Sequence, residues 1–183
     1  MQDDREKIPL LFPVHMVMLD PKFPPCECRT ITVQLTIKKA RLKTGDYLLL
    51  GHESKVMIER KKDLPELFTN LLTTAGRTRF VAACDRLRSE CTYPILILEG
   101  TIHQLIRSAK TYLKVDPWLV VDALHRICLE RHIQILYLPS TTPDHRRSVG
   151  EEVARLLING AITHAEYPPP ELPGSGTSEL CVR

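Results

Sequence analysis

The spacing of apolar residues changes along this chain, and that change limits the folds open to it. From Thr30 to Lys38 β-branched and polar residues alternate, which is typical of a strand with one buried face. The segments Tyr47 to Leu50 and Lys55 to Arg60 predict two more strands, joined by a turn-rich stretch short enough for an antiparallel hairpin. Beyond them, helical spacing alternates with two continuous apolar runs, Tyr93 to Glu99 and Ile133 to Leu138, which are typical of buried strands. The pattern predicts an α/β fold with a central mixed sheet flanked by helices.

Four segments have apolar residues at helical spacing. They start near Leu64, near Phe80, at Pro117 and near Asp144. We expect the first two helices to flank a charged loop that holds Gly76, Arg77 and Arg79. The stretch from Thr101 to Asp116 fits either a helix of its own or a loop. Trp118 is expected to anchor the start of its helix in the core.

Length and composition predict one folded domain with short flexible ends. The chain has 183 residues, of which 43% are hydrophobic and 26% charged, the usual balance of a globular protein. We expect a flexible N-terminus over residues 1–12, a folded domain over residues 13–166, and a disordered tail rich in Pro and Gly over residues 167–183.

The sequence shows neither a run of apolar residues long enough to cross a membrane nor a secretory signal. We therefore expect no membrane partner and an intracellular location, which is the cytoplasm of a prokaryotic or phage-infected cell, or the nucleus of a eukaryotic one. The six cysteines then need no disulfide framework. Cys26 and Cys28 have no second pair at zinc-finger spacing, so they are interpreted as two loop thiols.

Basic residues are concentrated in the middle of the chain. The formal net charge is only +3, but the segment from Lys38 to Arg88 holds twelve basic and six acidic residues. A basic surface of this kind favours a polyanionic partner such as DNA. We expect Lys43, Lys62, Arg77 and Arg79 to contact the DNA backbone.

The segment from Asp46 to Lys61 carries the residues best suited to chemistry. Side chains alternate between the faces of a strand, so Glu59 and Lys61 project from one face and Arg60 from the other. The predicted hairpin brings Asp46 beside Glu59. Two carboxylates suit Mg²⁺, which can polarise a phosphate and activate water, while an ammonium group offsets the charge of the transition state. The combination predicts hydrolysis of phosphodiester bonds.

Longer motifs around these residues are similar to a known family. The runs LKTGDYLLLG, VMIERK and PILILEG, with the leucine-rich helix between the last two, resemble the nuclease domain of the XPF family, which includes the Hef nucleases and small stand-alone phage relatives. The resemblance is strongest from Leu42 to Gly100 and extends to about residue 160 through the order of elements alone. It implies a restriction-endonuclease-like fold and Mg²⁺-dependent endonuclease activity on branched, flap or fork DNA, with Mn²⁺ able to substitute.

The resemblance also implies a role for individual residues. Asp46 and Glu59 match the metal-binding carboxylates, Lys61 matches the catalytic lysine, and Arg60 matches an arginine that is either structural or directed at phosphates. The family has a further acid after its E-R-K, for which Glu66 is the better candidate and Asp63 the other. An early aspartate of the family corresponds to Asp20, but the acidic partner that follows it in the family is missing here.

The resemblance leaves the assembly and the activity open. Family members read DNA through tandem helix-hairpin-helix repeats, and we find none after residue 160. We therefore expect a homodimer, or a heterodimer whose second subunit supplies DNA affinity. The alternative function is a catalytically silent scaffold or DNA-binding partner of another nuclease subunit. Cleavage of RNA, or of a specific sequence, is a third and weaker alternative.

Overall fold

A mixed six-stranded sheet forms the centre of the molecule. The computed structural model describes residues 1–4, 8–62, 64–113, 116–139 and 142–166. The strands, in their order across the sheet, are β4 (Lys39–Ala40), β1 (Gln2–Asp3), β5 (Tyr47–Leu48), β6 (Val56–Lys61), β7 (Tyr93–Leu98) and β8 (Gln134–Tyr137). Strands β6, β7 and β8 are parallel, whereas β5 is antiparallel to β6. The predicted fold class, an α/β fold around a mixed sheet, is therefore confirmed.

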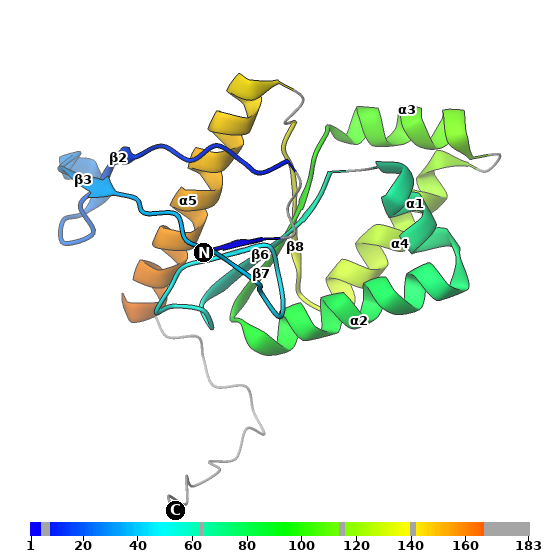
Figure 1. Cartoon of the computed structure of the whole chain (residues 1–183), viewed down its shortest axis with the longest axis horizontal. Coiled ribbons are helices and arrows are strands. Elements are labelled where there is room, and N and C mark those ends of the chain that lie inside the picture. Colours follow the sequence, from blue (N-terminus) through cyan, green and yellow to red (C-terminus); the bar gives the residue numbers. More distant parts are fainter. Residues whose placement is uncertain (5–7, 63, 114–115, 140–141, 167–183) are drawn as a thin grey trace, which may run out of the picture.

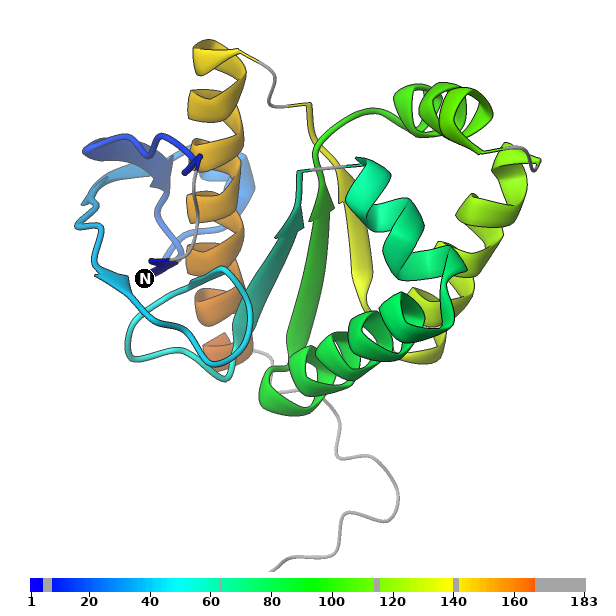
Figure 2. The same cartoon turned by 45° about the vertical axis from the view of Figure 1, so that its right-hand side comes forward.

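Helices cover both faces of this sheet (Figures 1 and 2). The first face packs against α1 (Leu64–Leu72), α2 (Thr74–Glu90), α3 (Ile102–Tyr112) and α4 (Pro117–Glu130), and the second against α5 (Pro143–Glu166). Strand β7 shows why: Leu96 and Leu98 belong to the core under the first four helices, while Ile95 and Ile97 belong to the core under α5. A strand buried on both faces explains the continuous apolar run of the sequence.

A separate two-stranded hairpin packs on the outer side of α5 (Figure 1). It pairs β2 (His15–Leu19) with β3 (Thr30–Gln34), and its loop contains the short 3₁₀ helix η1 (Pro25–Glu27). Met16 and Met18 bury its inner face against Ala154 of α5. The strand expected from Thr30 to Lys38 is thus shorter than expected and does not join the main sheet.

The start of the chain is part of the sheet, in contrast to the flexible segment expected over residues 1–12. Gln2 and Asp3 are buried in β1, between β4 and β5. The Asp3 backbone N–H donates to Asp46 O at 2.8 Å, and its carboxylate Oδ2 accepts from the Leu42 N–H at 3.1 Å. These bonds satisfy the polar groups of Asp3, a buried residue that its polarity alone would place at the surface. The expected disordered tail, residues 167–183, lies outside the described residues.

The prediction of a charged loop between the first two helices is wrong, because α2 begins at Thr74, two residues after α1 ends at Leu72. Thr73 caps α2 by accepting from the Gly76 N–H. A Cβ at Gly76 would lie 2.3 Å from Thr69 O, so glycine allows the two helices to meet this closely. Arg77 and Arg79 therefore lie on α2 itself, where both are exposed.

Helix α3 decides between two alternatives that the sequence left open, and α4 corrects one expectation. The stretch that fitted either a helix or a loop contains α3, whose N-terminus is fixed by a capping box between Thr101 and Gln104. Trp118 is 54% exposed, so its expected role as a core anchor is wrong. Asp116 caps α4 by accepting from the Trp118 N–H, and the buried face of the helix starts only at Val120. In the described part of the chain, no helix combines the length and apolar character needed to cross a bilayer.

Candidate active site

The register of the β5–β6 hairpin places Asp46 beside Glu59. Tyr47 pairs with Ile58 in the antiparallel ladder, and Asp46 directly precedes this pair. The Asp46 N–H donates to Ile58 O at 2.8 Å, and the Arg60 N–H donates to the Asp46 carboxylate at 2.7 Å. The backbone of β6 therefore fixes the orientation of the Asp46 carboxylate.

Glu59 and Lys61 share the face of β6 that is covered by α1 and α2. Met57, two residues earlier, is buried in the core beneath these helices, and the alternation of a strand continues through Glu59 to Lys61. Lys61 Nζ lies 2.6 Å from Glu59 Oε1, and each side chain is 20% exposed. The expected juxtaposition of the two residues is confirmed.

Three carboxylates determine the charge state of Lys61. Burial alone lowers the pKa of this ammonium group, but the charges of Glu59, Asp46 and Glu66 raise it, and the net result is a pKa above the ordinary value. Lys61 is therefore a cation at neutral pH. Asp46 and Glu66 thus act on Lys61 through their charges, after the larger effect of Glu59.

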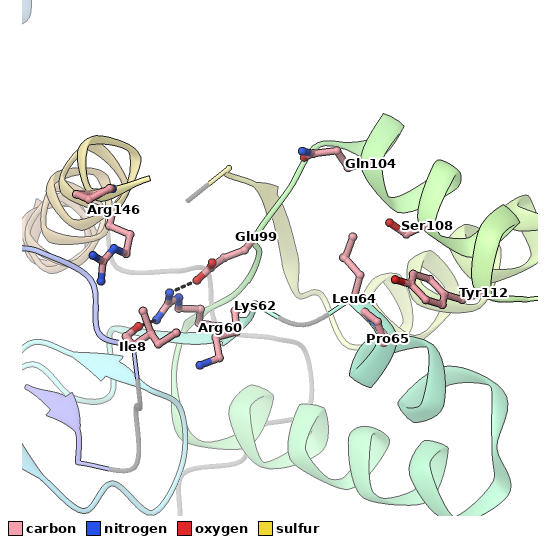
Figure 3. A pocket seen from close by; sticks show the side chains of 11 residues that line it. Ile8, Arg60, Lys62, Leu64, Pro65, Glu99, Gln104, Ser108, Tyr112 and Arg146 are labelled. Atoms are coloured by element: carbon pink, nitrogen blue, oxygen red, sulfur yellow. Dashed lines mark hydrogen bonds and ion pairs between the residues drawn. The ribbon is translucent and has the colours of Figure 1, made fainter. Parts of the chain in front are cut away.

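The alternation of the strand directs Arg60 to the face of the sheet opposite Glu59 and Lys61, and Figure 3 shows it beside Ile8 and Glu99. Its side chain is 1% exposed and forms an ion pair with Glu99, which follows the neighbouring strand β7. Arg60 Nη1 also donates to Ile8 O at 2.8 Å and lies 3.4 Å from Tyr47 Oη. Of the two roles considered for Arg60, the geometry matches the structural one.

The other acids named from the sequence differ in position. Glu66 lies in the first turn of α1, where its charge acts on Lys61. Asp63 lies outside the described residues. Asp20 directly follows β2 in the separate hairpin, and its carboxylate accepts from the Lys22 N–H at 3.0 Å. The structure does not bring Asp20 to Asp46, because the hairpin packs on the outer side of α5.

The donor set near Lys61 fits Mg²⁺ by its chemistry. Among the described residues there is no cluster of three or more His, Cys, Asp or Glu side chains arranged for a metal ion. Mg²⁺ is commonly bound by one or two carboxylates, with waters and substrate phosphate as the remaining ligands. Asp46, whose carboxylate lies at the Arg60 N–H, and Glu59, the preceding residue of β6, supply two carboxylates of this kind.

The basic residues expected to contact DNA do not form one group. Lys43 is exposed on the segment that leads to Asp46, and Arg77 and Arg79 are exposed on α2. Lys62 directly follows the site and lines a cleft together with Arg60 and Glu99. All four remain predicted DNA contacts.

The comparison with protein families settles the kinship of the chain. The ERCC4 domain matches residues 27–143, which is well over half of the 183 residues. The chain belongs to the ERCC4 domain family. The matched segment contains Asp46, Glu59 and Lys61, and the resemblance to the nuclease domain of the XPF family is confirmed. By family, this ERCC4 domain belongs to the class of DNA nuclease and repair domains.

Comparisons with single proteins add little to this result. No curated protein matches the chain. Among solved structures, XPF from Aeropyrum pernix is 20% identical, with a TM-score of 0.49 over 70% of this chain and 57% of that one. XPF from Aeropyrum pernix in complex with DNA is also 20% identical, with a TM-score of 0.45 over 66% of this chain and 52% of that one. The chain thus covers little more than half of these two structures.

Two residues that support the site of this ERCC4 domain were not found from the sequence. Glu99 holds Arg60, and a signal for it existed, because an acid that ends a buried apolar run needs a partner. Asp3 binds the backbone of Asp46 and of Leu42. Nothing in the first residues distinguishes Asp3 from the neighbouring acid Asp4.

Proposed function

We propose that this ERCC4 domain is a metal-dependent endonuclease that hydrolyses phosphodiester bonds of DNA. The convergence of Asp46, Glu59 and Lys61 near the end of β6 is the observation that carries the proposal. Asp46 and Glu59 would hold Mg²⁺, with Mn²⁺ as a substitute. When bound, the metal ion would polarise the scissile phosphate and promote attack by water.

The protein side chains contribute orientation and charge in this proposal. The Arg60 N–H holds the Asp46 carboxylate in place, and the ion pair of Arg60 with Glu99 fixes the ends of β6 and β7 relative to each other. Lys61, protonated at neutral pH, offsets the negative charge that develops on the phosphate during attack. Glu66, nearby on α1, is the proposed supporting acid.

Branched, flap or fork DNA is the proposed substrate, and a dimer the proposed assembly. The substrate class follows from the resemblance to the XPF family. The late helix α4 exposes three large apolar side chains, Trp118, Leu119 and Leu129, which favours contact with a second subunit. Light scattering would show a particle of twice the chain's mass, and a strict monomer that still cuts DNA would exclude the homodimer.

The proposal is tested by nicking of labelled flap and fork DNA in Mg²⁺, Mn²⁺ or EDTA. The parent protein should cut in either metal and not in EDTA, and Glu59→Ala should lose the cutting. Glu53→Ala is the matched control, because Glu53 is an acid in the turn of the same hairpin and bonds only locally, to the Gly51 N–H. Equal activity of the parent and Glu59→Ala would refute the assignment of the site.

A silent scaffold is the second candidate, and two observations favour it. Glu59 already forms an ion pair with Lys61, and Asp20 lies outside the site, so fewer acids converge than the family pattern implies. A scaffold would bind branched DNA without cutting it in any metal. Calorimetric titration with Mn²⁺ separates the two candidates, since a nuclease site should bind the ion and Glu59→Ala should abolish that binding.

A further inference from the structure

A cleft of about 700 Å³ opens where β6 and β7 end, next to the candidate active site (Figure 3). Its lining includes Arg60 and Glu99 at the ends of the two strands and Lys62, which directly follows Lys61. Gln104, Ser108 and Tyr112 of α3 line one side, and Arg146 of α5 lines the opposite side. The cleft therefore begins on the side of β6 that faces away from Glu59 and Lys61.

The charges that line the cleft favour an anion. Among the described residues that line it, the cations are Arg60, Lys62 and Arg146, and the one acid, Glu99, is paired with Arg60. Lys62, directly after β6, and Arg146, on α5, thus remain in excess. Pro143 and Arg146 in the first turn of α5 also line the cleft, so the positive end of this helix dipole adds to the field of the cations.

The uncharged groups favour a strand of nucleotides over a simple anion. Tyr112 is 68% exposed at the end of α3, and an exposed ring can stack on an unpaired base. Gln104 and Ser108, on the same helix, present an amide and a hydroxyl that bond to phosphates or base edges. The volume lies in the range that encloses a molecule of about drug size, which is too small for a duplex.

We propose that this cleft binds the unpaired strand of a branched DNA as it leaves the junction. The proposal rests on the proposed nuclease function for the position of the junction, but not for the binding of the strand. Phosphates would lie against Lys62 and Arg146, and a base would stack on Tyr112. The cleft would then distinguish flap and fork substrates from continuous duplex, which has no free strand to enter it.

Binding of a labelled oligothymidylate in EDTA tests the proposal without requiring catalysis. Arg146→Ala should weaken binding about fivefold at about 0.1 M salt and lower the slope of log K against log salt by about 0.7, because one phosphate contact to a single strand is lost. Arg147→Ala is the matched control. Arg147 is the next residue of α5 and carries the same charge, but it pairs with Asp144 on the exposed surface outside the cleft. Equal effects of the two variants would overturn the proposal.

The ring is tested separately, with variants that do not alter charge. Tyr112→Ala should weaken oligothymidylate binding by about fivefold or more, and Tyr112→Phe should retain it, because stacking requires the ring but not the hydroxyl. Blunt duplex should bind all variants equally. Displacement of oligothymidylate by poly-glutamate at equal charge concentration would overturn the proposal in favour of an acidic polypeptide, as would failure of the parent to bind the oligonucleotide.

Failure of this proposal and failure of the nuclease function can be distinguished. If the parent binds oligothymidylate through Arg146 and Tyr112 but cuts no DNA in any metal, the nuclease function fails and the cleft assignment stands. If the parent cuts flap and duplex DNA equally well, and Arg146→Ala changes neither, the cleft assignment fails and the nuclease function stands.

Discussion

Lys61 and Glu59, two residues apart on β6, form an ion pair of 2.6 Å on the face of the sheet beneath α1 and α2. The pair lies next to the Asp46 carboxylate, so the ammonium group is held within a group of acids that raise its pKa. The same Glu59 oxygen that binds Lys61 is a candidate metal ligand. The lysine and a divalent cation therefore compete for this oxygen, and this competition can be measured.

Replacing the lysine should separate metal binding from cutting. Lys61→Met removes the competing cation, so the Kd for Mn²⁺ measured by calorimetry should be unchanged or lower. Cutting of flap DNA should fall about 100- to 1,000-fold, because a donor directed at developing charge is lost. Lys61→Arg, which keeps the charge, should retain part of the activity. A Lys61→Met protein that cuts like the parent would contradict the proposed role of this residue.

The raised pKa of Lys61 also predicts how stability depends on pH. A cation whose pKa is higher in the folded state than in the unfolded state stabilises the fold fully below the ordinary value of 10.5 and loses this effect as pH rises through the folded value. The difference in free energy of unfolding between the parent and Lys61→Met should therefore be constant from about pH 7 to about pH 9.5. It should shrink above about pH 10.5. Urea denaturation at each pH measures it, and a difference that already shrinks near pH 8 would contradict the assignment.

The corner between α1 and α2 predicts a cost for any side chain at Gly76. A Cβ there would lie 2.3 Å from Thr69 O and 2.7 Å from Thr73 Oγ1, and the first of these is backbone that cannot rotate away. Gly76→Ala should lower the free energy of unfolding by about 1–3 kcal/mol, the usual effect of overpacking. Ala75→Ser, at an exposed position of the same turn, is the control and should change it little.

The geometry of the hairpin could be predicted because it depends on local pattern. Alternation along VMIERK placed Glu59 and Lys61 on one face, and the short turn placed Asp46 beside them. The partner of Arg60 could not be found in this way, because the pairing with Glu99 depends on the parallel register of β6 and β7, which are joined through two helices. Sequence pattern specifies the face of a strand but not the register of a distant neighbour.

The errors at the helices have physical causes as well. Gly76 is expected in a loop between two helices, whereas it lies inside α2, where the lack of a side chain permits a close contact with Thr69 O. Trp118 was assigned to the core for its size, but the cap at Asp116 sets the phase of α4 and leaves the ring exposed. The T-x-x-Q signal of the capping box at Thr101 was present in the sequence and would have identified α3.

Burial divides the cysteines of the described residues into two reactivity classes. Cys26 and Cys28 are exposed, whereas Cys84, Cys91 and Cys128 are buried. Burial raises the pKa of Cys84 and Cys128 to about 12 and that of Cys91 to about 11. The thiolate is the nucleophile, so iodoacetamide at pH 8 should modify Cys26 and Cys28 in the native protein and the other three only after unfolding. Peptide mass spectrometry measures this, and rapid native modification of Cys84 would contradict the packing of α2 against the sheet.

The pair of Arg60 and Glu99 should contribute more to stability than any exposed ion pair of this chain. Arg60→Met leaves Glu99, which is 13% exposed, without its charged partner, so the free energy of unfolding should fall by about 3–5 kcal/mol. In the double variant, Arg60→Met with Glu99→Met, the free energy of unfolding should fall by less than in Arg60→Met alone, because no buried charge is left unpaired. Arg147→Ala, which breaks an exposed pair with Asp144, should change stability little. Urea denaturation of the full cycle measures the coupling, and additive effects of the two single substitutions would show that Arg60 and Glu99 do not act as a pair.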